Sequence, residues 1–370
     1  MIAVDFARFA IGTVVLYAAT TVVFDVLHYA LHRCAASRFR VLRRVAAPHV
    51  VHHEFLGTSL RFDERLVWPN IWWHRVPEWT VQVAATACAA PFVPLSWVLC
   101  AAATHTVLFV ITVVGRGKDG NHVSLTTVPS PRSWFVGPAY HSLHHAYPES
   151  YMSSFVKLFD WVLGTGCHLR GKRIVMTGAS GAFGEPLRQL LEQEGAAVTA
   201  LRFGHDWTYD DYEGVDRALA TADILVLAHG AKGPQAMQAN CDSFVAFIER
   251  FLSRHPNALI PIEVWAVGSE IEAHPAWGNP ELQVYLESKR AYARHAWRYF
   301  RDRRFTYRHI VPAAFRSRMG PGLMSGRTAA RTAMFFIRRG FRYVPVTYTG
   351  IAFVNYWKFV FSRRDTSPTL

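Results

Sequence analysis

The stretch RIVMTGASGAFG, residues 173–184, decides the fold of the second half of this chain. It reads as a short apolar strand that runs into a glycine-rich turn, Gly178-x-x-Gly181-x-x-Gly184, which opens a helix. Glycines allow a tight turn there and let an anion approach the free N–H groups at the helix start. A glycine triplet alone is a weak signal, but the strand–turn–helix context makes it a much stronger one.

The segments that follow this turn alternate between strand and helix. Apolar strands are predicted at 173–176, 197–202, 223–228 and 262–267, with an amphipathic helix at 185–194. Alternation of this kind is typical of a parallel sheet of the doubly wound type. We therefore expect an α/β, Rossmann-like domain over residues 172–370, after a short linker that begins at residue 169.

A tyrosine and a lysine four residues apart, Tyr285 and Lys289, follow a serine, Ser269, at the end of a predicted strand. This pattern, together with the TGxxGxxG turn, resembles the short-chain dehydrogenases over about residues 171–315. The resemblance implies that Tyr285 is the general acid/base and that Lys289 lowers its pKa. It also implies that Ser269 holds the substrate oxygen. A surface coincidence is the competing interpretation of the Tyr–Lys pair alone.

The dinucleotide site predicted from these motifs uses residues of the turn, the second strand and the third strand. Arg202 ends the second strand, where no acidic residue stands, and could pair with a 2′-phosphate. NADP is therefore slightly favoured over NAD, although a solvated arginine is nearly as good an interpretation. By resemblance, Asn240 is the family's structural asparagine. The predicted cofactor-binding residues are Thr177, Gly178, Ser180, Gly181, Gly184, Arg202, His229, Gly230 and Asn240.

The first third of the chain is apolar enough to enter a membrane. Phe9–Leu31 has spanning length, and further apolar stretches run over residues 80–97 and 98–114, with prolines marking a turn between them. Three spans is the economical count, and a re-entrant hairpin over 80–114 would give the same sidedness. Basic residues follow the first and third stretches, which puts residues 33–77 and 115–370 in the cytoplasm. We expect an integral protein of the cytoplasmic membrane.

Charge and cysteine usage narrow the partners. The net charge is +13, and the basic residues flank apolar stretches, which favours lipid headgroups; we find no nucleic-acid motif. Five cysteines without a Cys-x-x-Cys pair argue against a disulfide framework and against a thiolate zinc site.

Histidines gather in spaced clusters before residue 170. Two H-x-x-H-H clusters and an H-x-x-x-H pair at the end of a span exceed what one tetrahedral zinc shell needs, so two metals of higher coordination number fit better. A lone histidine, such as His74 or His105, is more often interfacial. The predicted metal ligands are His28, His32, His49, His52, His53, His122, His141, His144 and His145.

The segments FDVLHYALHR (residues 24–33), HVVHHEF (49–55) and VGPAYHSLHH (136–145) resemble the histidine boxes of the fatty acid hydroxylase/sterol desaturase superfamily. The resemblance covers roughly residues 20–166. It implies an all-α transmembrane domain over residues 1–168 that holds two irons for O2-dependent oxidation of a lipid, with electrons from an external donor. The family's first box usually carries a further histidine where Ala36 stands here, and His28 is the expected substitute.

The order of the two domains resembles bacterial bifunctional sterol desaturase/short-chain dehydrogenase proteins. The leading hypothesis is hydroxylation or desaturation of a lipid or sterol-like substrate, coupled to NAD(P)-dependent interconversion of alcohol and carbonyl. Three alternatives stay open: wax-type aldehyde or acyl processing, a non-catalytic lipid-binding scaffold with a degenerate metal site, and a chain active only in its dehydrogenase domain. The basic, aromatic tail after residue 338 fits an interfacial helix or a completed core equally well.

Overall fold

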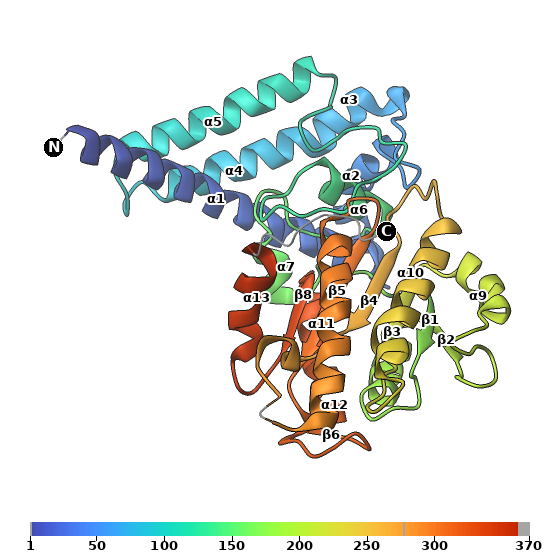
Figure 1. Ribbon diagram of the computed structural model, residues 1–370. Helices are drawn as coiled ribbons and strands as arrows, with labels where there is room; N and C mark the ends of the chain where they lie inside the picture. Colours follow the sequence, from blue (N-terminus) through green and yellow to red (C-terminus); the bar gives the residue numbers. More distant parts are fainter. Residues whose placement is uncertain (1, 277, 362–370) are drawn as a thin grey trace. The chain divides into compact units, whose positions relative to one another are not determined.

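The computed structural model of the protein describes residues 2–276 and 278–361 and divides the chain into two compact units that meet between residues 168 and 169 (Figure 1). The division falls beside the linker predicted from the sequence. The first unit is helical, and the second is built on a parallel sheet.

The helical unit holds two long helices and several shorter ones. Its elements are α1 (Ile2–Ala35), α2 (Arg40–Phe55), α3 (Val67–Asn70), α4 (Val76–Cys88), α5 (Leu95–Val114), α6 (Pro138–Ala146) and α7 (Leu158–Leu163). A single 3₁₀ turn at Glu64–Leu66 precedes α3, and a π-helical turn at Ile71–Arg75 joins α3 to α4. These segments therefore form one helical stretch with a π-bulge, a feature often found at functional sites.

The boundary predicted for the second apolar stretch, 80–97, is wrong. α4 ends at Cys88, residues 89–94 form a turn, and Trp97 lies in α5. Pro94 is the N-cap of α5; proline has no N–H to donate, so a chain that turns before it loses no helical hydrogen bond. The apolar composition runs without a break across this turn, which is why composition alone misplaced it.

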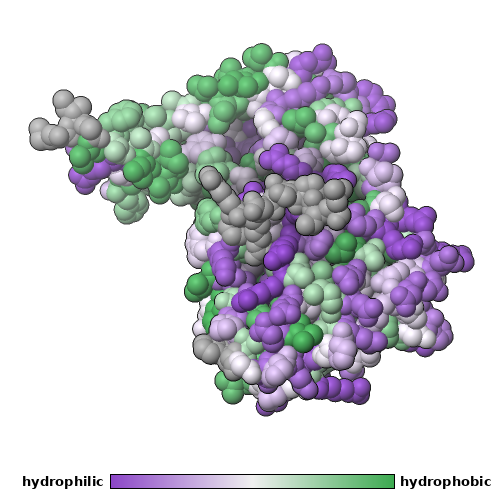
Figure 2. Space-filling view, viewed as in Figure 1, coloured by the Kyte–Doolittle hydropathy of each residue, from purple (hydrophilic) through white to green (hydrophobic). Residues whose placement is uncertain are grey.

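Two helices in the described part of the chain are long and apolar enough to cross a membrane, Val4–Ala35 and Leu95–Val114. Their apolar side chains are largely exposed, for example Val14 at 58% and Val107 at 57%. Figure 2 shows hydrophobic surface gathered over α1 and α5. The second predicted span, 80–97, corresponds to α4, whose 13 residues are fewer than a span requires.

The second unit is a six-stranded parallel sheet with the strand order β2-β1-β3-β4-β5-β8. This confirms the predicted doubly wound, Rossmann-like class, and each predicted strand begins and ends within a residue or so of the observed one. The strands are β1 (Arg173–Thr177), β2 (Ala197–Leu201), β3 (Ile224–Leu227), β4 (Glu263–Val267), β5 (Thr306–Pro312) and β8 (Tyr343–Val346), beside a small pair, β6 (Phe315–Arg316) and β7 (Met324–Ser325).

Helices cover both faces of this sheet. On one face, alternate strand residues such as Val175, Leu225 and Val264 pack in one core with residues of α9, α10, α11 and α13. Residues of the opposite parity, such as Val226 and Trp265, are also buried, and α8 contacts α12. The helices are α8 (Gly184–Gln193), α9 (Asp216–Thr221), α10 (Ser243–Ser253), α11 (Pro280–Arg301), α12 (Gly326–Arg338) and α13 (Ile351–Phe361). Short helical turns lie at Glu213–Val215, Gln238–Asp242 and Glu270–Ala273.

The aromatic tail completes the core of the second unit. β8 adds the sixth strand, and Ala352 and Phe359 of α13 belong to the same buried core as the sheet. One of the two interpretations left open for the tail is therefore observed.

Candidate functional site

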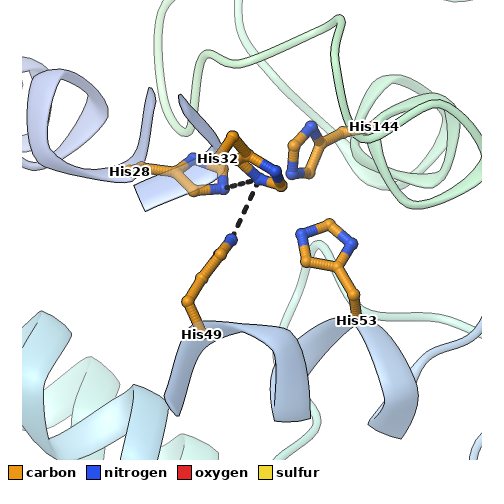
Figure 3. Close-up of side chains that lie close together, drawn as sticks. All are labelled: His28, His32, His49, His53 and His144. Carbon is orange, nitrogen blue, oxygen red and sulfur yellow. Dashed lines mark hydrogen bonds between the residues drawn. The ribbon is translucent and has the colours of Figure 1, made fainter. Parts of the chain in front are cut away.

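The nine histidines predicted as metal ligands converge in two groups. The first group contains five residues from three helices, and their ligand atoms all lie within 4.8 Å of one another: His28, His32, His49, His53 and His144. Figure 3 shows their rings pointing toward a common centre. The Nε2 atom of His32 lies 3.1 Å from that of His28 and 2.9 Å from that of His49.

The second group contains four histidines from α2, α6 and the loop before α6, again within 4.8 Å of one another: His52, His122, His141 and His145. Adjacent Nε2 atoms are 2.8 to 3.2 Å apart. Two nitrogens bound at right angles to one ion, each about 2.0–2.1 Å from it, would be separated by roughly 2.9 Å. The spacing in both groups is therefore that of ligands around one ion.

The outer nitrogens of four of these rings are held by protein oxygens. The Nδ1 atoms of His52, His122, His144 and His145 lie 2.7–2.9 Å from the Asn70 side chain, the Asp119 carboxylate, the Ser150 carbonyl and the Leu56 carbonyl, respectively. Because Nδ1 then donates outward, the lone pair of Nε2 faces the centre of the group. Orientation of this kind is typical of metal-bound histidines.

Other ring nitrogens are buried without a partner. Both nitrogens of His53 and Nε2 of His144 are buried and make no hydrogen bond. Burial lowers the pKa of His53 well below its ordinary value and that of His144 to about 4, so both rings are neutral at pH 7. An unpartnered buried nitrogen is costly, and a metal ion at the centre of each group would satisfy it. The residues present therefore fit two metal ions.

In the first histidine box, position 28 on α1 contributes to the first group and position 36 does not. His28 is 4% exposed and lies one turn before His32 on α1, whereas residue 36 lies beyond the end of the helix. The structure thus brings His28 into the first group, where the family pattern would use the position of Ala36.

Three residues beside the groups were not predicted from the sequence: His74 and Arg75, which are buried, and Asp119, which is half-buried. His74 stacks on His52 with ring centroids 3.8 Å apart, and its Nδ1 lies 3.3 Å from Nδ1 of His49. Arg75 pairs with Asp119 at 3.1 Å, and Asp119 in turn contacts His122. His74 has no partner histidine in its own segment, so spacing could not identify it; the Asp-x-x-His pattern before His122 was a usable signal.

A cavity of about 240 Å³ opens beside the metal-ligand groups. Histidines of both groups line it, as do apolar residues of the long helices such as Phe24, Leu108 and Phe109. An apolar chain in this cavity would therefore lie against both groups.

In the second unit, the glycine turn has the geometry that a pyrophosphate needs. Gly178 has φ +69°, and a Cβ atom there would collide with the backbone of residues 228 and 229. A Cβ atom on Gly184 would collide with the carbonyl of Gly178. Ser180 and Gly181 lie between them and line the same cavity. Only glycine fits positions 178 and 184, which brings the backbone close to a bound phosphate.

The neighbouring predicted residues hold this turn in place. His229 lies 2.7 Å from the Thr177 hydroxyl and 2.9 Å from the Ser243 hydroxyl, which ties the ends of β1 and β3 together. The Asn240 amide donates to the carbonyl of Ala231 at 2.7 Å, directly after Gly230. These contacts give His229 and Asn240 a supporting position beneath the predicted nucleotide site.

Arg202 lies outside the lining of that cavity. It is exposed at the end of β2, and its side chain contacts His205 at 3.0 Å and Asp206 at 3.5 Å. The sequence has no acidic residue at the end of β2, but the turn after β2 places the carboxylate of Asp206 beside Arg202. The contacts of Arg202 at the end of β2 therefore do not support the slight preference for NADP over NAD that was inferred from the sequence.

The three predicted catalytic residues line one cavity of about 880 Å³ together with the glycine turn. The Ser269 hydroxyl hydrogen-bonds Tyr285. Lys289 donates to the carbonyl of Val267 at 2.9 Å and lies 5.8 Å from the Tyr285 ring centre. Burial raises the pKa of Tyr285 to about 12 and lowers that of Lys289 to about 8. Burial thus sets the direction of both shifts, and the pKa of Tyr285 lies above its ordinary value even with Lys289 nearby.

A buried chain of polar groups beneath Ser269 was not foreseen. The Glu272 carboxylate accepts the backbone N–H of Ser269 at 2.9 Å and pairs with His309 at 3.2 Å. Tyr307 contacts His309 at 3.3 Å and Tyr292 at 2.8 Å. The chain connects β4, β5 and α11, the three elements that carry or flank the catalytic residues, and so fixes Ser269 relative to Tyr285.

Comparison with known proteins gives one relative that spans both units. The chain is 27% identical over 361 residues to a monoglucosyldiacylglycerol epimerase of Synechocystis sp., an alignment that covers 83% of this chain and 86% of that protein. No protein-family model matches the sequence.

Solved structures similar to the second unit include a short-chain dehydrogenase from Burkholderia cenocepacia in complex with NADP (17% identity, 53% of this chain, 100% of that chain, TM-score 0.43). A 3-ketoacyl-(acyl-carrier-protein) reductase from Brucella melitensis complexed with NADH is also similar (15% identity, 48% and 97% coverage, TM-score 0.39).

The parallel sheet, the glycine turn and the Ser–Tyr–Lys cavity confirm the predicted type of the second unit. The chain thus joins a helical unit with two histidine groups, compatible with a fatty acid hydroxylase-like domain, to a Rossmann-like unit in which Ser269, Tyr285 and Lys289 line one cavity with the glycine turn. The similarity to an epimerase over both units supports an enzyme.

Proposed function

We propose that this protein interconverts alcohol and carbonyl groups on a lipid at the Tyr285 cavity, while anchored in a membrane. One observation carries the proposal: Ser269, Tyr285 and Lys289 line the same cavity as the glycine turn. A bound NAD(P) supplies the acceptor and donor of hydride there.

The chain's own residues then handle the proton and the orientation. The Ser269 hydroxyl, which interacts with Tyr285 by a hydrogen bond, holds the substrate oxygen. In its phenolate form, Tyr285 takes the hydroxyl proton as the carbonyl forms, and the resulting phenol returns it when the alcohol forms again. The buried ammonium of Lys289 stabilises negative charge on the tyrosine oxygen as the proton leaves it. Oxidation followed by reduction on the opposite face of the carbonyl would invert the carbon without net use of nucleotide.

We infer that the substrate is a sugar-bearing lipid and that the net reaction is epimerisation. The relative that matches both units is, by its name, an epimerase of monoglucosyldiacylglycerol. Polar side chains that line the cavity, including Lys232, His274 and Thr349, suit a headgroup rich in hydroxyls.

The test is turnover by the purified full-length protein in detergent, with monoglucosyldiacylglycerol and NAD or NADP. We expect an epimer of the glucosyl headgroup, no accumulation of reduced nucleotide, and loss of product with Tyr285→Phe. The matched variant Tyr356→Phe, on α13, should retain activity. Net reduction of nucleotide with a ketone product would identify a plain dehydrogenase. No reaction with this lipid and with other lipid alcohols would refute the proposal.

A second candidate function rests on the two histidine groups and their adjoining cavity. Two bound irons would supply the activation of O2 for hydroxylation or desaturation of an apolar carbon. The histidines would hold the ions, and Phe24, Leu108 and Phe109 would align an apolar lipid chain beside them. The electrons would come from an external donor protein.

Oxygen-18 labelling distinguishes the outcomes at this second site. Retention of the label in a lipid alcohol would support hydroxylation, and a shortened hydrocarbon would support wax-type processing. If the protein purified from iron-supplemented cells carries no metal, the helical unit is a lipid-binding scaffold instead.

We further propose that α1 spans the cytoplasmic membrane, that α4 and α5 enter it together as a hairpin, and that both sites face the cytoplasm. The basic residues after α1 and after α5 support this orientation. Labelling of a cysteine placed at Arg43 in intact cells by a membrane-impermeant maleimide should fail until the membrane is permeabilised; labelling beforehand would reverse the orientation.

A further inference from the structure

Helix α13 has two faces of opposite character. Ala352, Asn355 and Phe359 are at most 5% exposed and pack into the second unit. At about 100° per residue, these three side chains occupy one narrow face. The opposite face carries apolar side chains that are 51–71% exposed, namely Phe353, Val354, Trp357 and Phe361.

Neighbouring aromatic residues extend this outward face onto α12. Phe336 contacts Phe353 with ring centroids 6.3 Å apart and contacts Phe335, which is 50% exposed, at 5.3 Å. Trp357 stacks on Phe361 at 5.7 Å. We call this surface the aromatic patch: Phe335, Phe336, Phe353, Val354, Trp357 and Phe361.

The segment that carries the aromatic patch has charges of a single sign, and one of them, Arg338, pairs with Glu194 at 3.2 Å. From Gly326 to Phe361 the sequence contains six basic residues and no aspartate or glutamate. The Arg339 guanidinium lies 3.5 Å from the centre of the Phe335 ring, and Lys358 is exposed at the edge of the outward face of α13. A patch of aromatic side chains on a segment whose own charges are all positive is complementary to an anionic lipid–water interface.

The start of α13 is connected to the active-site cavity. Thr349 and Ile351 line that cavity. Buried Glu270, next to Ser269, accepts hydrogen bonds from the Thr349 hydroxyl at 2.9 Å and from the Ala352 N–H at 3.0 Å. The outward face of α13 therefore begins at the rim of the cavity that holds Tyr285.

We propose that the aromatic patch inserts into the headgroup region of an anionic bilayer and brings the Tyr285 cavity to the membrane surface. The two apolar helices of the first unit tether the chain to that bilayer, which makes it the nearest apolar phase for the aromatic patch. A cavity opening at this level would receive a lipid headgroup without extraction of the lipid into water. The membrane contact does not depend on which reaction the cavity catalyses.

The experiment uses the full-length protein without its five cysteines, reconstituted in nanodiscs of phosphatidylglycerol and phosphatidylcholine. A nitroxide is attached at one introduced cysteine, Trp357→Cys, or Val354→Cys if the first variant does not fold. Electron paramagnetic resonance then compares the accessibility of the label to oxygen, which enters the bilayer, and to a water-soluble nickel chelate. Val107→Cys on α5 and Asp210→Cys on an exposed loop serve as the lipid and water references.

We expect an oxygen-to-nickel accessibility ratio at position 357 that is several-fold above that at position 210 and approaches that at 107. A ratio equal to that at 210 would show that the aromatic patch faces water and would overturn the proposal. Shielding from both reagents would show that protein covers the aromatic patch, either the helical unit or a second copy, and would overturn it equally. The label reports only the position of residue 357, so the result does not depend on whether the cavity turns over a lipid headgroup.

Discussion

Removal of the Glu272 carboxylate gives the sharpest test of the buried support beneath Ser269. Its side chain is 3% exposed and that of His309 is 0% exposed. Glu272→Ala would leave the Ser269 N–H and Nε2 of His309 without their partner, each costing about 1–3 kcal/mol. Breaking a buried ion pair on one side typically costs about 3–5 kcal/mol, which agrees with that sum.

The loss in the free energy of unfolding can be measured as a decrease in the unfolding temperature, Tm, of the second unit. For a unit of about 200 residues, 1 kcal/mol corresponds to roughly 2–4 °C, so Glu272→Ala should lower Tm by roughly 6–20 °C. Scanning calorimetry of the full chain in detergent is the assay. Glu272→Gln keeps an acceptor for Ser269 and should lose less. Glu192→Ala removes an exposed carboxylate paired with Arg188 at 3.2 Å and should shift Tm very little. Equal, small shifts for Glu272→Ala and Glu192→Ala would refute the reasoning.

Four further predictions concern the two sites. Tyr285→Phe should lower turnover by about 10²–10⁴-fold while nucleotide binding, measured by fluorescence titration, is retained; loss of binding as well would contradict a role confined to proton transfer. Gly184→Ala drives a Cβ atom into the Gly178 carbonyl and should weaken nucleotide binding by roughly tenfold or more, as measured by calorimetric titration, at an overpacking cost of about 1–3 kcal/mol. His144→Gln and His141→Gln lie in different groups, so each should lower the metal content, measured by mass spectrometry, by about one ion per chain, whereas His255→Gln should not change it; loss of both ions in either variant would mean that the two sites do not bind independently. Burial lowers the pKa of Lys289 from 10.5 to about 8. Between these pH values the unfolded chain holds a proton that the folded chain lacks, so the free energy of unfolding rises with pH. Lys289→Met should remove this rise, which is worth about 3 kcal/mol at most, and the difference between the unfolding midpoints at pH 8 and pH 10 measures it.

The sequence predicted those features that follow from local pattern. Each strand of the second unit that was predicted has an apolar run bounded by polar residues, and the glycine turn could be read because positions 178 and 184 admit no side chain. The histidine boxes could be recognised in the sequence because their spacing places imidazoles on one face of a helix.

Features that depend on packing between distant segments were not predictable. His74 lies in the π-helical turn that precedes α4, and no spacing in the sequence encodes that turn. The Glu272–His309 pair joins residues 37 positions apart on different elements. The raised pKa of Tyr285 likewise follows from burial in the folded cavity and not from its distance to Lys289 along the chain.

The most direct test of the central claim is the fate of deuterium placed on the carbinol carbon of the lipid substrate. The account predicts that the deuterium appears on the nicotinamide ring in a single turnover or returns to the same carbon of the epimer. Release of that deuterium to water would contradict it, because the carbon–hydrogen bond would then have broken by proton loss and not by hydride transfer at the Tyr285 cavity.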